Sequence, residues 1–146
     1  MRQRGLDYLG KREYSYAELG QKLKTYLAED ESVEQITEIL DDFKARGWLS
    51  DARFTEQIVH ARSHKFGASK IANELREKGI AHELIATAIE QVKENEFDNA
   101  KEIWRKKFKA SPTSREGWAK QARFLQSRGF GFDLIKKVLN TKDNVD

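Results

Sequence analysis

The sequence predicts an all-α protein made of tandem three-helix repeats. Apolar residues recur at helical spacing along nearly the whole chain, as at Ile36, Ile39, Leu40 and Phe43, and no run alternates with the period of a strand. The 146 residues include one proline and nine glycines, so few positions would interrupt a helix. A helix–glycine–helix motif also returns at a fixed offset, which indicates an internal repeat.

The apolar stripes and their end signals predict a series of helices. They are expected at residues 3–12, 16–27, 33–46, 51–65, 69–78, 82–93, 97–109, 114–128 and 132–140. Ser15, Ser32 and Thr113 each precede a glutamate or glutamine by three residues, which is the spacing of a capping box. We therefore expect these three residues to be N-caps.

Three glycines predict helix ends. Gly47, Gly79 and Gly129 each follow a basic residue and precede an apolar one. Glycine takes the left-handed conformation at this position without strain, and the next apolar residue packs back on the last turn.

The repeat emerges when the segments around these glycines are aligned. Residues 75–89 match residues 125–139 at an offset of 50, and residues 14–23 match residues 66–75 at an offset of 52. We expect three repeats, at residues 1–49, 50–95 and 96–146, which stack on a shared core.

Composition excludes several classes of protein. The chain has no cysteine for a disulfide framework, a formal net charge of +3 and no apolar run of membrane-spanning length. No apolar segment follows Met1 as in a signal peptide, so we expect a cytoplasmic protein and no membrane partner.

The residue pattern does not favour an enzyme. His60 and His64 have the spacing of two ligands on one helix, but no third ligand is evident, and we interpret them as exposed polar residues. Gly129-Phe130-Gly131 lies at a helix joint and lacks the features of a phosphate-binding loop. We expect no catalytic residue, metal or cofactor.

Basic residues gather in the last third, which has twelve basic and six acidic groups. Lys101, Arg105 and Lys109 are expected on one helical row, with Arg115 and Arg123 in the next helix. They form either a solvated face or a surface that contacts an acidic or phosphate-bearing partner, and both interpretations stay open.

Most aromatic residues fall on predicted core stripes: Tyr14, Trp48, Phe54, Phe66, Trp104, Trp118 and Phe124. Exposure is expected for Tyr16, Tyr26 and Phe132. Because a single-stranded nucleic acid binder needs exposed aromatic platforms, this pattern argues against that primary role.

Several spaced motifs resemble the signature of the RecX family. The central run Gly47-Trp48-Leu49-Ser50-Asp51-Ala52-Arg53-Phe54 is followed by Arg62, Phe66-Gly67, Lys70-Ile71, Glu74-Leu75 and Lys78-Gly79-Ile80. Tyr14-Ser15 near the start and Arg128-Gly129-Phe130 near the end extend the resemblance to about residues 5–140. Trp48 is a departure, since the family usually has tyrosine there.

The resemblance implies a monomeric cytoplasmic regulator of the RecA recombinase, acting in DNA repair, homologous recombination and the SOS response. Members bind the groove of the RecA–single-stranded DNA filament and generally inhibit its ATPase, co-protease and strand-exchange activities. The family fold is a curved, elongated array of three three-helix repeats. The alternative is a helical nucleic-acid-binding module that acts directly on DNA; a weak direct DNA contact fits either function.

The resemblance also suggests where a filament would be contacted. Arg53, Arg62, Lys65 and Lys70 match family positions and frame Phe66-Gly67 in the sequence. Together with the basic residues of the last third, they give nine candidates: Arg53, Arg62, Lys65, Lys70, Lys101, Arg105, Lys109, Arg115 and Arg123.

Overall fold

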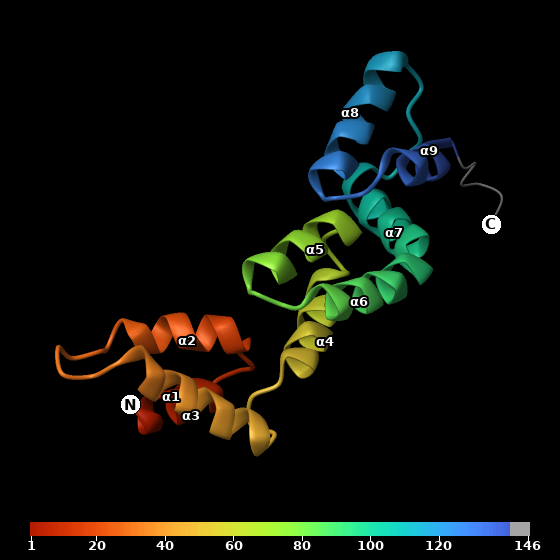
Figure 1. Ribbon diagram of the computed structural model, residues 1–146. Helices are drawn as coiled ribbons and strands as arrows, with labels where there is room; N and C mark the ends of the chain where they lie inside the picture. The colour runs from red at the N-terminus through yellow and green to blue at the C-terminus, as the bar shows by residue number, and fades with distance from the viewer. Residues whose placement is uncertain (141–146) are drawn as a thin grey trace. The chain divides into compact units, whose positions relative to one another are not determined.

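The computed structural model describes residues 1–140, and over that range the chain forms nine helices and no strand (Figure 1). The helices are α1 (Arg2–Leu9), α2 (Tyr16–Lys24), α3 (Val33–Ala45), α4 (Asp51–Arg62), α5 (Ala68–Glu77), α6 (His82–Glu94), α7 (Glu96–Phe108), α8 (Arg115–Ser127) and α9 (Phe132–Asn140). The predicted all-α fold of repeated three-helix units is confirmed, and each helix overlaps its expected range.

Side chains cap the helices as expected at two of the three positions. The Ser15 hydroxyl accepts a hydrogen bond from the Glu18 N–H at 3.0 Å, and the Gln35 side chain accepts one from the Ser32 N–H at 3.2 Å. The cap expected at Thr113 is wrong by one residue. Ser114 takes that place, because its extended backbone directs its hydroxyl to the Gly117 N–H at 2.9 Å.

The three glycine stops are confirmed. The φ angles of Gly47, Gly79 and Gly129 are 77°, 75° and 93°. After each glycine, the next N–H reaches back to a helix carbonyl; for example, the Ile80 N–H donates to the Leu75 oxygen at 3.1 Å. These bonds satisfy carbonyls that the helix itself leaves unpaired.

Helix α7 ends differently from the prediction. It stops at Phe108, and Lys109 adopts a left-handed conformation with φ of 66°. Its N–H still donates to the Arg105 carbonyl at 3.2 Å. The prediction that Lys109 continues the helical row of Lys101 and Arg105 is therefore wrong, because Lys109 lies in the turn after the helix.

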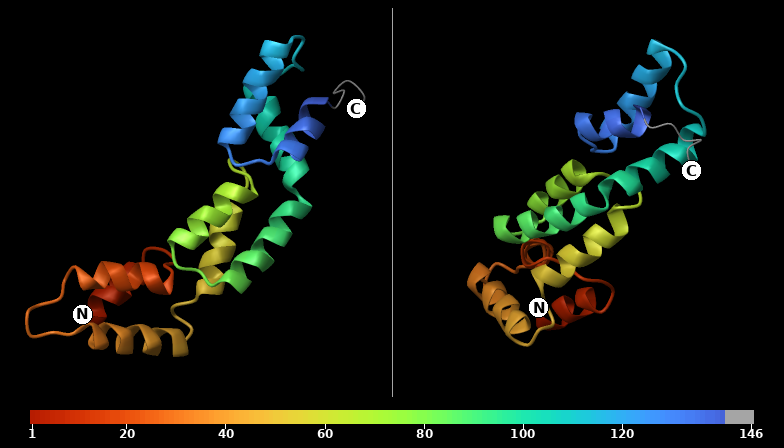
Figure 2. Two further views of the ribbon diagram at one scale, coloured as in Figure 1. Left: turned by 45° about the horizontal axis from the view of Figure 1, so that its top comes forward. Right: turned by 90° about the vertical axis from the view of Figure 1, so that its right-hand side faces the viewer.

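The chain divides into two compact units. The first comprises residues 1–57 and 75–85, and the second comprises residues 58–74 and the chain from residue 86 onward. The first core contains Tyr14, Leu19, Leu23, Ile36, Leu40, Phe43 and Leu49. In the second unit, α9 packs against both α7 and α8, and Figure 2 shows these three helices together in both views. This second core contains Ala100, Ile103, Trp104, Leu125, Phe130, Ile135, Val138 and Leu139.

Trp48 is the main error in the predicted core. It is 43% exposed, and the Arg46 guanidinium lies 5.1 Å from the centroid of its ring. Leu49 is buried instead, because the Gly47 turn directs the next residue outward and the following one into the core.

The other aromatic residues follow the prediction more closely. Tyr14, Phe54 and Trp104 are buried, whereas Phe66, Trp118 and Phe124 are half-buried. Tyr26 and Phe132 are exposed as expected. Tyr16, which was also expected to be exposed, is half-buried.

Alanine at the three glycines would separate backbone strain from close packing. Each variant should lose about 1–3 kcal/mol of unfolding free energy from its positive φ. Gly79→Ala and Gly129→Ala should lose more than Gly47→Ala. A Cβ would lie 2.6 Å from the Ala17 Cβ at position 79 and 2.8 Å from the Lys70 nitrogen at position 129, but nothing lies within 4 Å at position 47. Urea unfolding measures the differences, and equal losses at all three positions would contradict the packing argument.

Candidate functional site

The first joint, as we name it, is the contact between the Lys78–Gly79 turn and the start of α2. The Ser15 hydroxyl donates a hydrogen bond to the Lys78 carbonyl oxygen at 2.6 Å. Gly79 approaches Ala17 so closely that a Cβ on the glycine would lie 2.6 Å from the alanine Cβ. The turn therefore closes on the helix start with room only for a hydrogen atom.

Charges at the first joint are compensated within the chain. One oxygen of the Glu18 carboxylate lies 2.7 Å from an Arg12 nitrogen and 3.1 Å from the Lys78 Nζ. Burial by itself raises the pKa of Glu18, but the hydrogen bonds from Arg12 and Lys78 outweigh it and hold the pKa below its ordinary value of 4.5. Glu18 is thus an ionised bridge between two cations.

The second joint is the contact between the Arg128–Gly129 turn and the start of α5. The Gly67 N–H donates to the Arg128 carbonyl at 2.7 Å, and the Ser69 N–H donates to the Gly129 carbonyl at 3.3 Å. A Cβ on Gly67 would lie 2.6 Å from the Gly129 oxygen. The same arrangement is thus built twice, at positions that the repeat aligns.

The charges at the second joint differ from those at the first. The repeat aligns Lys70 with Glu18, and Arg128 with Lys78. The Arg128 guanidinium lies 5.8 Å from the Phe66 ring centroid and 5.0 Å from that of Phe124, while the Lys70 Nζ lies 5.1 Å from Phe66. We call Lys70, Lys107, Arg128, Phe66 and Phe124 the cation–phenylalanine cluster, since Lys107 also lies over Phe124 at 5.7 Å.

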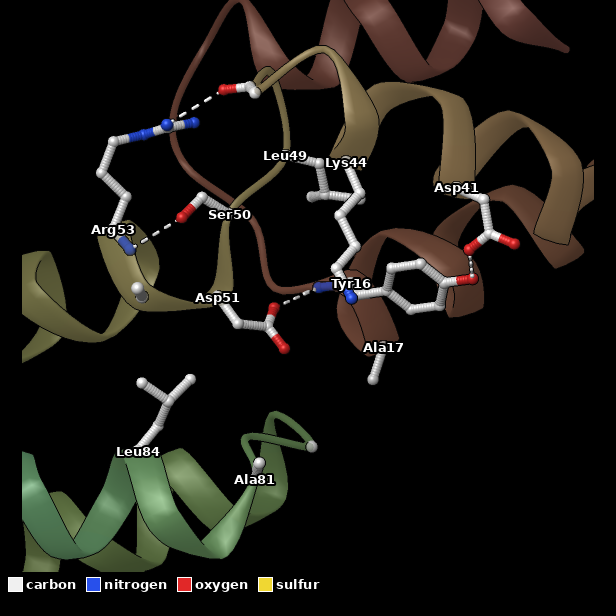
Figure 3. Close-up of a pocket in the computed structure, with 13 residues that line it drawn as sticks. Tyr16, Ala17, Asp41, Lys44, Leu49, Ser50, Asp51, Arg53, Ala81 and Leu84 are labelled. Atoms are coloured by element: carbon white, nitrogen blue, oxygen red, sulfur yellow. Dashed lines mark hydrogen bonds between the residues drawn. The ribbon is translucent and has the colours of Figure 1, made fainter.

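Within the first unit, the residues of the first joint also border a cavity of about 710 Å³ (Figure 3). Figure 3 shows the two acidic side chains of its wall directed at Tyr16. Asp51 accepts the Tyr16 N–H at 2.8 Å, and Asp41 accepts the Tyr16 hydroxyl at 2.7 Å. The bond to Asp41 raises the pKa of Tyr16 to about 12, so the phenol stays protonated at neutral pH.

Arg53 and Arg62, two of the nine candidates, form close ion pairs with carboxylates of other segments of the chain. Arg53 pairs with Glu13 and donates to the Gly47 carbonyl at 3.0 Å, which ties α4 to the turn after α3. Arg62 holds Glu74 with two hydrogen bonds, at 2.7 and 2.9 Å. The guanidinium charge of both residues is compensated locally.

The remaining candidates are spread over the second unit. Lys65 and Lys70 are exposed beside the second joint, where the Lys65 carbonyl accepts from Arg128 at 3.4 Å. Lys101 is half-buried on α7, and Arg105 is exposed 3.7 Å from Glu102. Exposed residues complete the set: Lys109 after α7, Arg115 at the start of α8 and Arg123 within it.

The sequence did not predict that Lys107 and Arg128 lie with Lys70 in one cluster over Phe66 and Phe124. The repeat alignment contains a signal for the change of charge: Arg128 aligns with Lys78, and Lys70 aligns with Glu18. Comparing the charges at aligned positions would have singled out the second joint.

Residues 1–140 contain neither a group of side chains suited to a metal nor a membrane-spanning helix. This range has no cluster of three or more His, Asp or Glu side chains suited to hold a metal. The His60 and His64 rings lie 6.0 Å apart. No helix within the same range is long and apolar enough to cross a bilayer.

The Glu18 bridge predicts a pH-dependent contribution to stability. The folded-state pKa of Glu18 is lowered, so its contribution is present above the ordinary pKa of 4.5 and is lost as pH falls through the folded value. Glu18→Gln should lower the urea midpoint at neutral pH, and the difference from wild type should shrink in acid. Glu29→Gln, at an exposed position, is the control. A pH-independent difference between wild type and Glu18→Gln would contradict the bridge.

Comparison with known proteins identifies relatives of the whole chain. Residues 94–139 match the family model described as the third three-helix domain of RecX, and residues 50–89 match that of the second. The regulatory protein RecX of Leptothrix cholodnii is 38% identical over 141 residues, covering 97% of this chain and 88% of the relative. That of Herbaspirillum seropedicae is 37% identical over 141 residues, covering 97% and 90%.

A solved structure also resembles the fold. The crystal structure of RecX from Lactobacillus salivarius superposes with a TM-score of 0.79 at 19% identity, covering 95% of this chain and 92% of that one. At this identity the similarity concerns the fold alone.

Proposed function

This chain belongs to the RecX family of regulatory proteins, and on that premise we propose that it restrains the RecA recombinase. It binds in the groove of the RecA filament on single-stranded DNA, and this lowers ATP hydrolysis, co-protease activity and strand exchange. The observation that carries the proposal is the family relationship, which extends over 97% of the chain.

The repeated construction supports binding to a polymer. Three tandem repeats, which we propose to occupy residues 1–49, 50–95 and 96–146, place several contact surfaces on one chain. Simultaneous contact with several RecA protomers raises the effective concentration at each contact, so each can be weak. Acidic residues 26–56 and the basic last third also give the chain two electrically different parts, which would orient it on a polar filament.

Arg53 and Arg62 are each held by a carboxylate of another segment of the chain. A filament carboxylate would compete with Glu13 for Arg53 and with Glu74 for Arg62. We propose that the direct contacts come from the other candidates, and that Arg53 and Arg62 position the helices that carry them. The other candidates are Lys65, Lys70, Lys101, Arg105, Lys109, Arg115 and Arg123.

The proposed function predicts inhibition of RecA. Substoichiometric amounts of the protein should suppress single-stranded-DNA-dependent ATP hydrolysis by RecA, since one bound chain contacts several protomers. A coupled ATPase assay with the protein titrated in measures this effect. An unchanged rate at equimolar protein and RecA would overturn the proposal. Binding to bare DNA at rising salt, with and without RecA, distinguishes filament recognition from the direct DNA-binding alternative.

Charge reversal on α7 and α8 provides a second prediction. Arg105→Glu combined with Arg123→Glu should weaken inhibition, and the loss should be larger at low salt because screening hides surface charge at high salt. Both positions are exposed, so helical content should not change. Lys22→Glu with Lys24→Glu makes the same charge change at exposed positions of α2 and should inhibit as wild type does. Equal inhibition by the two double variants at low salt would contradict these contacts.

A further inference from the structure

We infer that the second joint is a binding site for a carboxylate side chain from an acidic segment of a protein partner. The inference extends the proposed function, because it names one surface that contacts the partner and the chemical group that this surface binds. It depends on the proposed function only for the identity of that partner.

The two joints differ at one charged position. At the first joint, a Glu18 oxygen bridges two cations, one of them the lysine of the glycine turn. At the second joint, the basic residue of the turn is Arg128, but the residue aligned with Glu18 is Lys70. The turn carbonyl accepts from the start of the helix in both joints, while the anion of the first joint is replaced by a cation in the second.

The cations of the second joint lie over aromatic rings rather than beside carboxylates. Phe66 has Lys70 and Arg128 over its ring, and Phe124 has Arg128 and Lys107. Within residues 1–140, none of these three cations forms a salt bridge. Exposed Lys65 adds a further charge beside them.

The Phe66 and Phe124 rings hold the cations in positions where they can bind an anion. Cation–ring contacts restrict where the ammonium and guanidinium groups lie, so less conformational freedom is lost when a ligand binds. Gathering like charges is unfavourable, and an incoming carboxylate relieves that repulsion while gaining charge-assisted hydrogen bonds. The site therefore favours an anion before any partner arrives.

The geometry favours a carboxylate over a nucleic acid strand. Sequence-tolerant binding of single strands relies on open aromatic faces on which bases stack. Here Phe66 and Phe124 are half-buried, cations lie over both rings, and Phe124 also meets Phe108 at a centroid distance of 5.3 Å. At the aligned position of the first joint, moreover, the bound anion is a carboxylate.

The decisive variant is Lys70→Glu, which gives the second joint the acidic residue of the first. Gly129 packs on the Cβ and Cγ of Lys70, and glutamate keeps both atoms. The new carboxylate should pair with Arg128 and occupy the site. Binding of a short poly-glutamate peptide at low salt, followed by fluorescence anisotropy without RecA, should weaken on the order of tenfold or more. The unfolding midpoint should be unchanged or higher.

Two further variants make the test specific. Lys120→Glu changes the charge equally at an exposed position of α8 and should bind the peptide within a small factor of wild type. Lys70→Gln removes the cation without supplying an anion, so its affinity should lie between those of wild type and Lys70→Glu. If Lys70→Glu fails to fold by circular dichroism, the comparison of Lys70→Gln with wild type decides the test.

Two outcomes would overturn the inference. One is equal peptide binding by wild type, Lys70→Glu and Lys70→Gln. The other is an absence of peptide binding while oligothymidylate binds in a Lys70-dependent way, which would assign the cluster to phosphate. Neither outcome depends on RecA, so a failure here is distinct from a failure to inhibit ATP hydrolysis.

Discussion

The closure of a glycine turn on the start of an earlier helix is the contact on which both compact units depend. A turn carbonyl accepts from the Ser15 hydroxyl in one unit and from the Gly67 N–H in the other. Carbonyls left unpaired at a helix end need such donors when water is excluded. The close approach also explains the unit boundaries. Residues 75–85 group with the start of the chain, and residues 58–74 group with its end, because each side of residues 50–95 takes part in a different joint.

In both joints a turn carbonyl accepts a hydrogen bond from the residue at the start of the helix, but the electrostatics differ. Glu18 forms ion pairs with Arg12 and Lys78, and the pair with Lys78 holds the start of α2 against the turn. At the aligned position, Lys70 can make no such bridge with Arg128, and Phe66 holds both cations instead. Repeats that close in the same way can therefore differ in surface charge through one position, because the closure of the turn on the helix does not require the ion pair.

Local signals explain why so much of the fold could be predicted. The apolar stripes and the glycines at 47, 79 and 129 act within one or two turns of helix, and the structure has them where expected. The errors in the predicted helix ends arise where adjacent residues could both take the same role or where the backbone changes conformation. Ser114 rather than Thr113 caps α8, and nothing in the local pattern foretold the left-handed Lys109. The pairing of Arg53 with Glu13 joins residues far apart in sequence, so no periodicity could predict it.

For the candidate site, too, the sequence predicted local features but not contacts between distant residues. Composition located the basic residues in the last third, but it did not distinguish charges that stabilise the fold from charges left for a partner. The structure makes that distinction through the neighbours of each cation. Arg62 faces Glu74, whereas Arg128 faces Phe66 and Phe124. An arginine paired with a carboxylate must exchange one partner for another when it binds, whereas an arginine held on aromatic rings gains an anion without losing one. We therefore propose that the second joint is one of the surfaces through which the chain recognises its partner, and that the ion pairs of Arg53 and Arg62 keep the helices in place.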